Sequence, residues 1–273
     1  MIKKFAIIGN PITHSLSPVL HNYWFEKYSI EANYSIINVK DNNLDNIIKK
    51  IRDKELSGLN ITLPFKQKIV SNVDILVNDA KLTSSVNTIY LNDQKKLIGE
   101  NTDVFGLQAA YLKEIDDCSK KEALVIGAGG VSPSVILSLQ KSGVKNISIT
   151  NRTKEKCIFL KNKFKSLKII DWINLKENLK NFDIIINATS LGLKGGQDFD
   201  FNFDSVKSNL IYIDTIYNPL ETKTLKNLKE RDIKVFNGLE MFIYQGQKAF
   251  YLWNKINPEI DQKLIETLLS KLK

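Results

Sequence analysis

The segment from Ala123 to Ser142 limits most strongly what this chain can fold into. Ala123–Ile126 is a continuous apolar run, Gly127-Ala-Gly-Gly130 is a predicted tight turn, and Val131–Ser142 is a predicted helix. A buried strand that passes through a glycine turn into a helix is typical of a dinucleotide-binding unit, although such turns also arise for packing alone. The segment therefore predicts parallel strands joined by a helical crossover.

The same alternation of short apolar runs and helical segments extends along nearly the whole chain. It predicts an α/β fold with helical crossovers, divided into two domains near residues 102–120, where the polar stretch 116–121 has the composition of a linker. Strands are expected at Lys4–Gly9, Tyr34–Val39, Gly58–Thr62, Val86–Leu91, Lys96–Gly99, Asn146–Thr150, Ile184–Ile186 and Leu210–Ile213. Further helices are expected at Pro18–Tyr28, Leu44–Ile51, Asp103–Ile115 and Lys154–Phe164, and on either side of Asn257-Pro258.

The formal net charge of +9 would suit nucleic acid or a membrane surface, but its distribution argues against both. Only three of the 39 basic residues are arginine, and the lysines are scattered rather than clustered among aromatic residues. We therefore expect no nucleic-acid or membrane partner. An anionic small-molecule substrate and an anionic cofactor account equally well for a mild positive charge.

Other features favour a cytoplasmic protein without a metal site. No apolar run approaches the ~20 residues of a membrane helix, and the apolar run before Gly9 is shorter than the core of a signal peptide. The two cysteines, Cys118 and Cys157, and the two histidines, His14 and His21, have no metal-ligand spacing. Both a monomer and a homodimer remain open.

The end of the strand that follows the glycine turn bears on the choice of cofactor. An NAD site usually carries Asp or Glu about 20 residues after the turn, where it binds the ribose 2′-hydroxyl. Here the strand ends in Asn151-Arg152-Thr153, with Lys154 and Lys156 close behind. Because a guanidinium suits a 2′-phosphate, the sequence indicates NADP rather than NAD. The alternative is a solvated helix start.

Polar residues also gather at predicted strand ends and turns elsewhere. Asn187-Ala-Thr189-Ser190 follows a buried strand, at the edge of the sheet where α/β proteins bind ligands. Ser15 and Ser17 precede a helix, where they would bind a carboxylate or where Ser17 would only cap the helix. His14 beside Ser15 is not by itself a catalytic pair. A lysine at 66 and an aspartate at 103, with Asn87, predict a polar cleft capable of proton transfer, unless the two charges form a surface salt bridge.

These motifs, in this order, resemble the shikimate dehydrogenase family. The matching segments are Ser15-Leu-Ser17-Pro18, Asn60-x-Thr62-x-Pro64-x-Lys66, Val86-Asn87-Thr88, Gly99-x-Asn101-Thr102-Asp103, Gly127-Ala-Gly-Gly130, Asn151-Arg-Thr153, Asn187-Ala-Thr-Ser190, Asp214-x-x-Tyr217-x-Pro219 and Gly238-x-x-Met241-x-x-x-Gln245. The resemblance implies reversible NADP-linked reduction of 3-dehydroshikimate to shikimate. It also implies a substrate and catalytic domain (1–102), an NADP-binding Rossmann-type doubly wound domain (103–237) and final helices (238–273) that return to the first domain.

The resemblance also implies roles for individual residues. Lys66 and Asp103 match the catalytic pair and also contact the substrate, Ser15 and Ser17 would bind the substrate carboxylate, and further substrate contacts are implied for Thr62, Asn87, Tyr217 and Gln245. Cofactor contacts are implied for Gly127, Ala128, Gly129, Gly130, Val131, Asn151, Arg152, Thr153, Lys156, Thr189, Ser190, Thr215 and Gly238.

Two alternatives remain at this stage. A quinate/shikimate dehydrogenase that uses NAD is disfavoured because the strand end Asn151-Arg152-Thr153 carries no carboxylate. A basic nucleic-acid-binding protein is disfavoured by the scattered lysines. Within the predicted reaction, Lys66 is the candidate proton donor in reduction, and stabilisation of a developing alkoxide is its alternative role.

Overall fold

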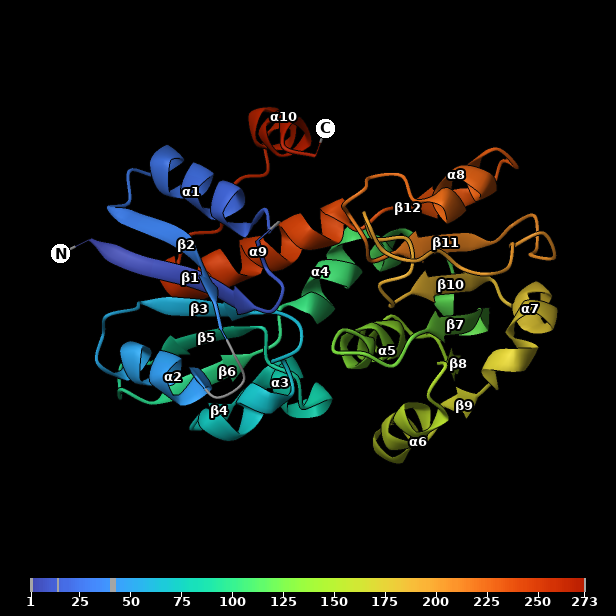
Figure 1. Cartoon of the computed structure of the whole chain (residues 1–273), viewed down its shortest axis with the longest axis horizontal. Coiled ribbons are helices and arrows are strands. Elements are labelled where there is room, and N and C mark those ends of the chain that lie inside the picture. The colour runs from blue at the N-terminus through green and yellow to red at the C-terminus, as the bar shows by residue number, and fades with distance from the viewer. Residues whose placement is uncertain (1, 14, 40–42, 273) are drawn as a thin grey trace. The chain divides into compact units, whose positions relative to one another are not determined.

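The polar and apolar runs of the sequence form two six-stranded sheets in the computed structural model, which describes residues 2–13, 15–39 and 43–272 (Figure 1). His14 lies outside the described residues. The chain divides into unit 1, residues 1–106 and 243–273, and unit 2, residues 107–242. Both divisions fall inside helices, one in α4 (Asp103–Ala110) and one in α9 (Leu239–Asn254).

The sheet of unit 1 is mixed, with the strand order β2-β1-β3-β5-β6-β4. β1 pairs in parallel with β2 and β3, whereas β5 is antiparallel to both β3 and β6. The short polar connection between β5 and β6 explains why these two strands are antiparallel, because a parallel pair needs a long crossover. The strands are β1 (Lys3–Gly9), β2 (Ala32–Asn38), β3 (Gly58–Ile61), β4 (Ile75–Leu76), β5 (Thr88–Leu91) and β6 (Leu97–Glu100).

Helices cover both faces of this sheet. The apolar stripe of α2 (Leu44–Arg52) packs with Ile8, Leu59 and Ile61 into one core. On the other face, the rings of Phe5, Phe25 and Trp253 pack together, so α9 joins α1 (Ser17–Lys27) there. α10 (Gln262–Ser270) contacts α1, and α3 (Asn78–Thr83) contacts β6. The predicted return of the final helices to the first domain is therefore confirmed.

Unit 2 is a Rossmann-type sheet in which every pair of strands is parallel, as predicted. Its order is β12-β11-β10-β7-β8-β9, so the strand order reverses between β7 and β10, where doubly wound folds bind ligands. The strands are β7 (Glu122–Ile126), β8 (Asn146–Thr150), β9 (Lys168–Ile169), β10 (Ile184–Asn187), β11 (Ile211–Asp214) and β12 (Lys234–Phe236). The helices are α5 (Ser132–Lys141), α6 (Lys154–Lys163), α7 (Leu175–Asn178) and α8 (Lys223–Lys229).

Two parts of unit 2 differ from the sequence-based expectation. The stretch 116–121 is not an open linker, because it holds a 3-10 helix (Cys118–Lys120) in which Cys118 is buried. The connection from β10 to β11 carries no helix. Instead, Phe199, Phe201 and Phe203 pack against the core of that face. Other 3-10 helices lie at Lys68–Asn72, Leu112–Glu114, Trp172–Asn174 and Leu179–Asn181. None of the helices in the described part of the chain is long and apolar enough to cross a membrane.

Candidate active site

A buried ion pair joins the end of β3 to the start of α4. Lys66 Nζ lies 2.6 Å from Asp103 Oδ2, and the two side chains are only 11% and 6% exposed. The backbone carbonyl of Lys66 accepts a hydrogen bond from Val86 N at 2.8 Å, which fixes the turn after β3 against the residues that precede β5. Because the pair is buried, the alternative of a surface salt bridge is wrong.

Asn101 fixes the position of Asp103 by capping α4. Its Oδ1 accepts hydrogen bonds from the backbone amides of Asp103 at 3.1 Å and Val104 at 3.4 Å. Its Nδ2 donates to the carbonyl of Ser85 at 2.9 Å. Side-chain oxygens at this position satisfy amides that have no partner within the helix, and the helix N-terminus favours a carboxylate. The local sequence therefore explains why Asp103 stands at the first turn of α4.

Asn87 holds the second oxygen of the Asp103 carboxylate. Asn87 Nδ2 donates to Asp103 Oδ1 at 2.8 Å and to Thr102 Oγ1 at 2.9 Å, while Asn87 Oδ1 accepts from Thr102 N at 2.8 Å. Gln245 of α9 joins this cluster, with its Oε1 3.5 Å from both Asn87 Nδ2 and Thr102 Oγ1. The structure thus brings together Lys66, Asn87, Asp103 and Gln245. Thr102 was missed as a site residue, although it stands inside a recognised motif.

The other predicted substrate residues of unit 1 lie at the ends of β1 and β3 and at the start of α1. Ser15 Oγ accepts from Ser17 N and lies 3.2 Å from Ser17 Oγ. The N-cap residue of α1 is Leu16, so Ser17 is not the helix cap. Thr62 is half-buried, and its N donates to the carbonyl of Ile8 at 2.9 Å. Both serine hydroxyls and the threonine hydroxyl are suited to bind polar groups of a ligand.

The glycine turn of unit 2 joins β7 to α5. Gly127 has φ +111°, and a Cβ there would lie 2.8 Å from the carbonyl oxygen of Ala188, so only glycine fits. A Cβ at Gly129 would meet no atom within 4 Å, which leaves open space beside the backbone. Gly129 N donates to Ser132 Oγ at 2.9 Å, and Ala128 N donates to Asn151 Oδ1 at 3.2 Å. Ser132, the first residue of α5, therefore binds the turn to the start of that helix.

Three cations follow β8, and they differ in their surroundings. Lys154 Nζ lies 2.5 Å from Asp171 Oδ1, so its charge is compensated. Arg152 and Lys156 are exposed, and neither forms an ion pair or a side-chain hydrogen bond within the residues that the structure describes. Asn151 Nδ2 donates to the carbonyl of Thr153 at 3.0 Å, which shapes the bend between the strand and α6. Arg152 and Lys156 are therefore available to an anionic ligand.

The carboxyl ends of β10 and β11 are tied together by buried polar groups. Asn187 Nδ2 donates to Asp214 Oδ1 at 3.2 Å, and Thr215 Oγ1 donates to the carbonyl of Asn187 at 2.9 Å. Burial raises the pKa of Asp214 to about 6, even though Thr222 Oγ1 and the Ile216 amide donate to its carboxylate. Asp214 was not predicted as a site residue.

The remaining predicted residues of unit 2 surround this edge of the sheet. Thr189 Oγ1 donates to Asn187 Oδ1 at 2.7 Å, and Ser190 follows it in an exposed turn. A Cβ at Gly238 would lie 2.3 Å from the carbonyl oxygen of Thr215, so the two backbones touch. The ring of Tyr217 packs on Phe242, with centroids 4.7 Å apart. Tyr217 thus belongs to unit 2, unlike the other predicted substrate residues.

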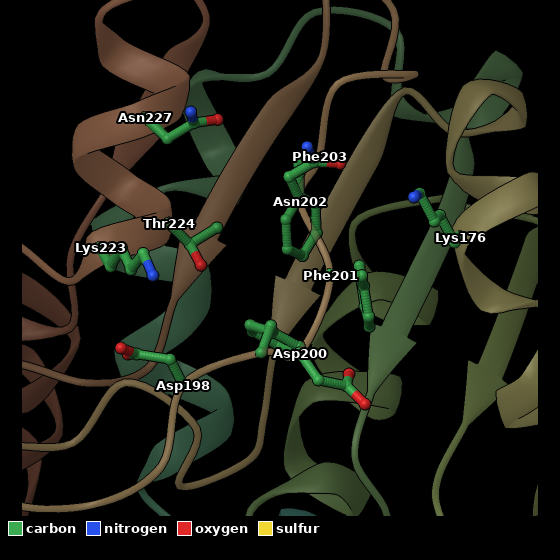
Figure 2. A pocket seen from close by; sticks show the side chains of 10 residues that line it. Lys176, Asp198, Asp200, Phe201, Asn202, Phe203, Lys223, Thr224 and Asn227 are labelled. Atoms are coloured by element: carbon green, nitrogen blue, oxygen red, sulfur yellow. The ribbon is translucent and has the colours of Figure 1, made fainter.

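A separate hollow in unit 2, of about 550 Å³, contains none of the predicted site residues (Figure 2). It lies where the connection from β10 to β11 passes α8. Its lining consists of Lys176, Asp198, Phe199, Asp200, Phe201, Asn202, Phe203, Lys223, Thr224 and Asn227. Among the described residues, no group of three or more His, Cys, Asp or Glu side chains is placed to hold a metal ion.

Two family models match most of the chain. One, described as "Shikimate dehydrogenase substrate binding domain", matches residues 7–89. The other, described as "Shikimate / quinate 5-dehydrogenase", matches residues 109–193. The matched ranges contain the Lys66 turn and the Gly127 turn, respectively.

Similar proteins cover nearly the full length of the chain. It is 45% identical over 268 residues to the shikimate dehydrogenase (NADP(+)) of Pelagibacter ubique, which covers 98% of this chain and 99% of that protein. The shikimate dehydrogenase structure from Aquifex aeolicus aligns with a TM-score of 0.89 at 34% identity, over 98% of this chain and 97% of that one. That of Thermus thermophilus with NADP(H) and shikimate aligns with a TM-score of 0.88 at 29% identity, over 99% and 100%. The chain therefore belongs to the shikimate dehydrogenase family.

Proposed function

We propose that this protein catalyses the reversible NADPH-dependent reduction of 3-dehydroshikimate to shikimate. Its relatives carry the name shikimate dehydrogenase (NADP(+)), and one similar structure holds both NADP(H) and shikimate. The observation that carries the proposal is the buried Lys66–Asp103 pair, whose second carboxylate oxygen is bound by Asn87. A charged pair is costly to bury, and this one supplies the proton-transfer group that the reaction needs.

We assign the donation of the proton to Lys66. When the ketone is reduced, its oxygen gains a proton, and an ammonium group has three N–H donors. One of them is directed to Asp103 Oδ2, which leaves others for the substrate oxygen. Asp103 holds the ammonium in place. Stabilisation of a developing alkoxide by the same positive charge remains the alternative role of Lys66.

The residues of unit 2 fit a bound NADP. We assign the pyrophosphate to the turn formed by Gly127, Ala128, Gly129, Gly130 and Val131, because the absent side chain of Gly129 leaves space beside the backbone. The 2′-phosphate is assigned to Arg152 and Lys156, which have no ionic partner among the described residues and lie next to Asn151 and Thr153. Thr189, Ser190, Thr215 and Gly238 complete the proposed contacts. When bound, the nicotinamide supplies the hydride that the reaction consumes.

The remaining assignments concern the substrate and the cellular setting. Ser15 and Ser17 are assigned to the substrate carboxylate, and Thr62, Asn87, Tyr217 and Gln245 to its other polar groups. The enzyme is proposed to act in the cytoplasm as a monomer or homodimer, with a small molecule as its substrate. Cys118 and Cys157 are both free thiols, which suits a reducing compartment.

The direct test is the initial rate of nicotinamide reduction by the purified protein. Shikimate and quinate are each offered with NADP and with NAD. Turnover of shikimate with NADP and little turnover in the other three combinations is the expected result. Preferential use of NAD or quinate would assign the protein to the broader-specificity branch, and the absence of any turnover would contradict the proposed reaction.

A further inference from the structure

A second set of buried hydrogen bonds reaches the Lys66–Asp103 pair from β2. Tyr34 Oη donates to Asn60 Oδ1 at 2.7 Å. Asn60 Nδ2 donates to the backbone carbonyl of Asn87 and to Thr88 Oγ1, both at 3.0 Å. Asn87 then donates to Asp103 Oδ1 at 2.8 Å. The hydroxyl of Tyr34 is therefore connected to the catalytic carboxylate through two amide side chains.

The strand register explains how residues far apart in sequence meet. In the parallel part of the sheet, Tyr34 of β2 lies opposite Phe5 of β1, while Asn60 of β3 lies opposite Ile7. Residues 5 and 7 of one strand point to the same face, so Tyr34 and Asn60 share that face. In the antiparallel pair, Asn60 lies opposite Thr88. The hydroxyl of Tyr34 thus reaches diagonally across β1 to Asn60.

The Asn87 carbonyl, which can only accept, sets the direction of the Asn60 amide, and the Tyr34 hydroxyl satisfies the oxygen at its other end. An amide side chain has an acceptor end and a donor end, and this one is only 5% exposed. With Tyr34 Oη at its oxygen, the amide nitrogen faces the carbonyl of Asn87. Without that donor, Asn60 Oδ1 is a buried acceptor that has lost this partner, and a flipped amide would place two oxygens against each other. The hydrogen bond from the Tyr34 hydroxyl therefore holds the Asn60 amide at the position from which it donates to the Asn87 carbonyl.

The ring of Tyr34 is itself held in place by aromatic packing. It stacks on the imidazole of His21 at a centroid distance of 4.5 Å and an interplanar angle of 9°. Trp253 of α9 lies 5.2 Å from the same imidazole. Burial lowers the pKa of His21 to about 3, so the ring is neutral at physiological pH. A neutral, fully buried partner allows Tyr34 to keep one position.

We propose that Tyr34 is a positioning residue for the reaction. Its hydroxyl holds the Asn60 amide in place, and Asn60 in turn binds the backbone carbonyl of Asn87 and the hydroxyl of Thr88, so that Asn87 can donate to Asp103. The inference rests on the proposed function, because the Lys66–Asp103 pair matters only if it serves the reaction. Tyr34 does not need to touch the substrate or the cofactor for this role.

The test is the Tyr34→Phe variant, which removes one oxygen atom and keeps the stacked ring. We expect kcat for shikimate oxidation to fall about tenfold, the size expected for one lost buried hydrogen bond, while the KM for NADP changes less than about twofold. Tyr28→Phe is the matched control. Its hydroxyl accepts from Glu259 N at 2.9 Å at an exposed site outside the network, so kcat should stay at the wild-type value.

A double-mutant cycle separates positioning from general destabilisation. Thr88→Val removes the hydroxyl that accepts from Asn60 Nδ2 and donates to Asn87 Oδ1. Because both changes break the same route, the double variant should lose less activity than the product of the two single losses. Tyr28→Phe combined with Thr88→Val should give the simple product. Thermal unfolding of each variant fixes the fraction of folded enzyme.

The outcomes separate the inference from the proposed function. A wild-type kcat in folded Tyr34→Phe, or fully multiplicative losses with Thr88→Val, would overturn the positioning role alone. If the wild-type protein fails to turn over shikimate, the proposed function fails and the inference fails with it. If Tyr34→Phe does not fold, Thr88→Val alone must lower kcat without raising the KM for NADP, and an unchanged kcat would overturn the inference.

Discussion

Lys66 and Asp103 form a pair in which each carboxylate oxygen has a different partner: Oδ2 accepts from Lys66 and Oδ1 from Asn87. The carboxylate is therefore satisfied on both sides before any substrate binds. The ammonium, in contrast, has donors to spare. This asymmetry makes the lysine the group that is free to act on a ligand.

The first prediction concerns the loss of that lysine. Lys66→Ala should lower kcat by about 10²–10⁴-fold, the usual contribution of a positioned proton donor, without weakening NADP binding. Steady-state kinetics and a binding titration with NADP measure the two effects. Lys49→Ala removes an exposed partner of Asp53 and serves as the control, with unchanged kinetics. A Lys66→Ala enzyme with wild-type kcat would contradict both roles considered for Lys66.

The second prediction concerns the cations after β8. Arg152→Ala should raise the KM for NADP by about 10- to 100-fold and change the KM for NAD much less, because only NADP carries the 2′-phosphate. Lys154→Ala should have a smaller effect, since Lys154 is already bound to Asp171. KM measurements of both variants with NADP and with NAD test this ranking of the two substitutions. Equal losses for NADP and NAD in Arg152→Ala would refute a 2′-phosphate contact.

The third prediction concerns the open space beside Gly129. Gly129→Ala adds a methyl group that meets no atom within 4 Å, so the free energy of unfolding should change by less than about 1 kcal/mol. The same methyl group would occupy the space proposed for the pyrophosphate, and the KM for NADP should rise at least about tenfold. Denaturant unfolding and kinetics measure the two quantities. A folded variant that binds NADP normally would place the pyrophosphate elsewhere.

The fourth prediction concerns acid stability and His21. Burial lowers the pKa of His21 from 6.5 to about 3, so below pH 6.5 the unfolded chain takes up a proton that the folded chain excludes. With respect to His21, the free energy of unfolding is therefore highest above pH 6.5 and falls progressively as the pH falls toward 3. At pH 5 the loss is about 2 kcal/mol relative to pH 7. Denaturant unfolding at the two pH values measures it.

The control for this effect is His21→Phe, which keeps an aromatic ring at the site. Between pH 7 and pH 5, the free energy of unfolding of His21→Phe should fall less than that of the wild-type protein. Asp214 acts in the opposite direction, because its pKa is raised to about 6 and its protonation stabilises the folded chain as the pH falls. Asp214 is present in both proteins, so their difference isolates His21. Identical pH dependence in the two would contradict a buried neutral histidine.

Much of the architecture was predictable because it depends on local patterns. The strand at Asn146–Thr150 has the predicted bounds, and α2 begins at the predicted Leu44. α8 and β12 were missed, because α8 (KTLKNLK) has only two buried residues and β12 only three residues. Such short elements form because neighbouring strands and helices supply the packing, which no local pattern records.

The candidate site was predictable only in part. Lys66 and Asp103 stand 37 positions apart, yet each lies in a recognisable motif, and the structure joins them. The contact of Tyr34 with Asn60 was not predictable, because it depends on the register of three strands. The burial of Asp214 likewise follows from tertiary packing. The individual roles assigned to the binding residues stay predictions until the variants are measured.

The cap on α4 links the proposed catalytic carboxylate to the folding of this helix. Asn101 binds the amides of Asp103 and Val104, so the turn that starts the helix is also the turn that presents the carboxylate to Lys66. If Asp103 serves the proposed reaction, we expect enzymatic activity during refolding to return no earlier than the protection of these two amide protons from exchange with solvent. The time course of returning activity would then report on the formation of the first turn of α4.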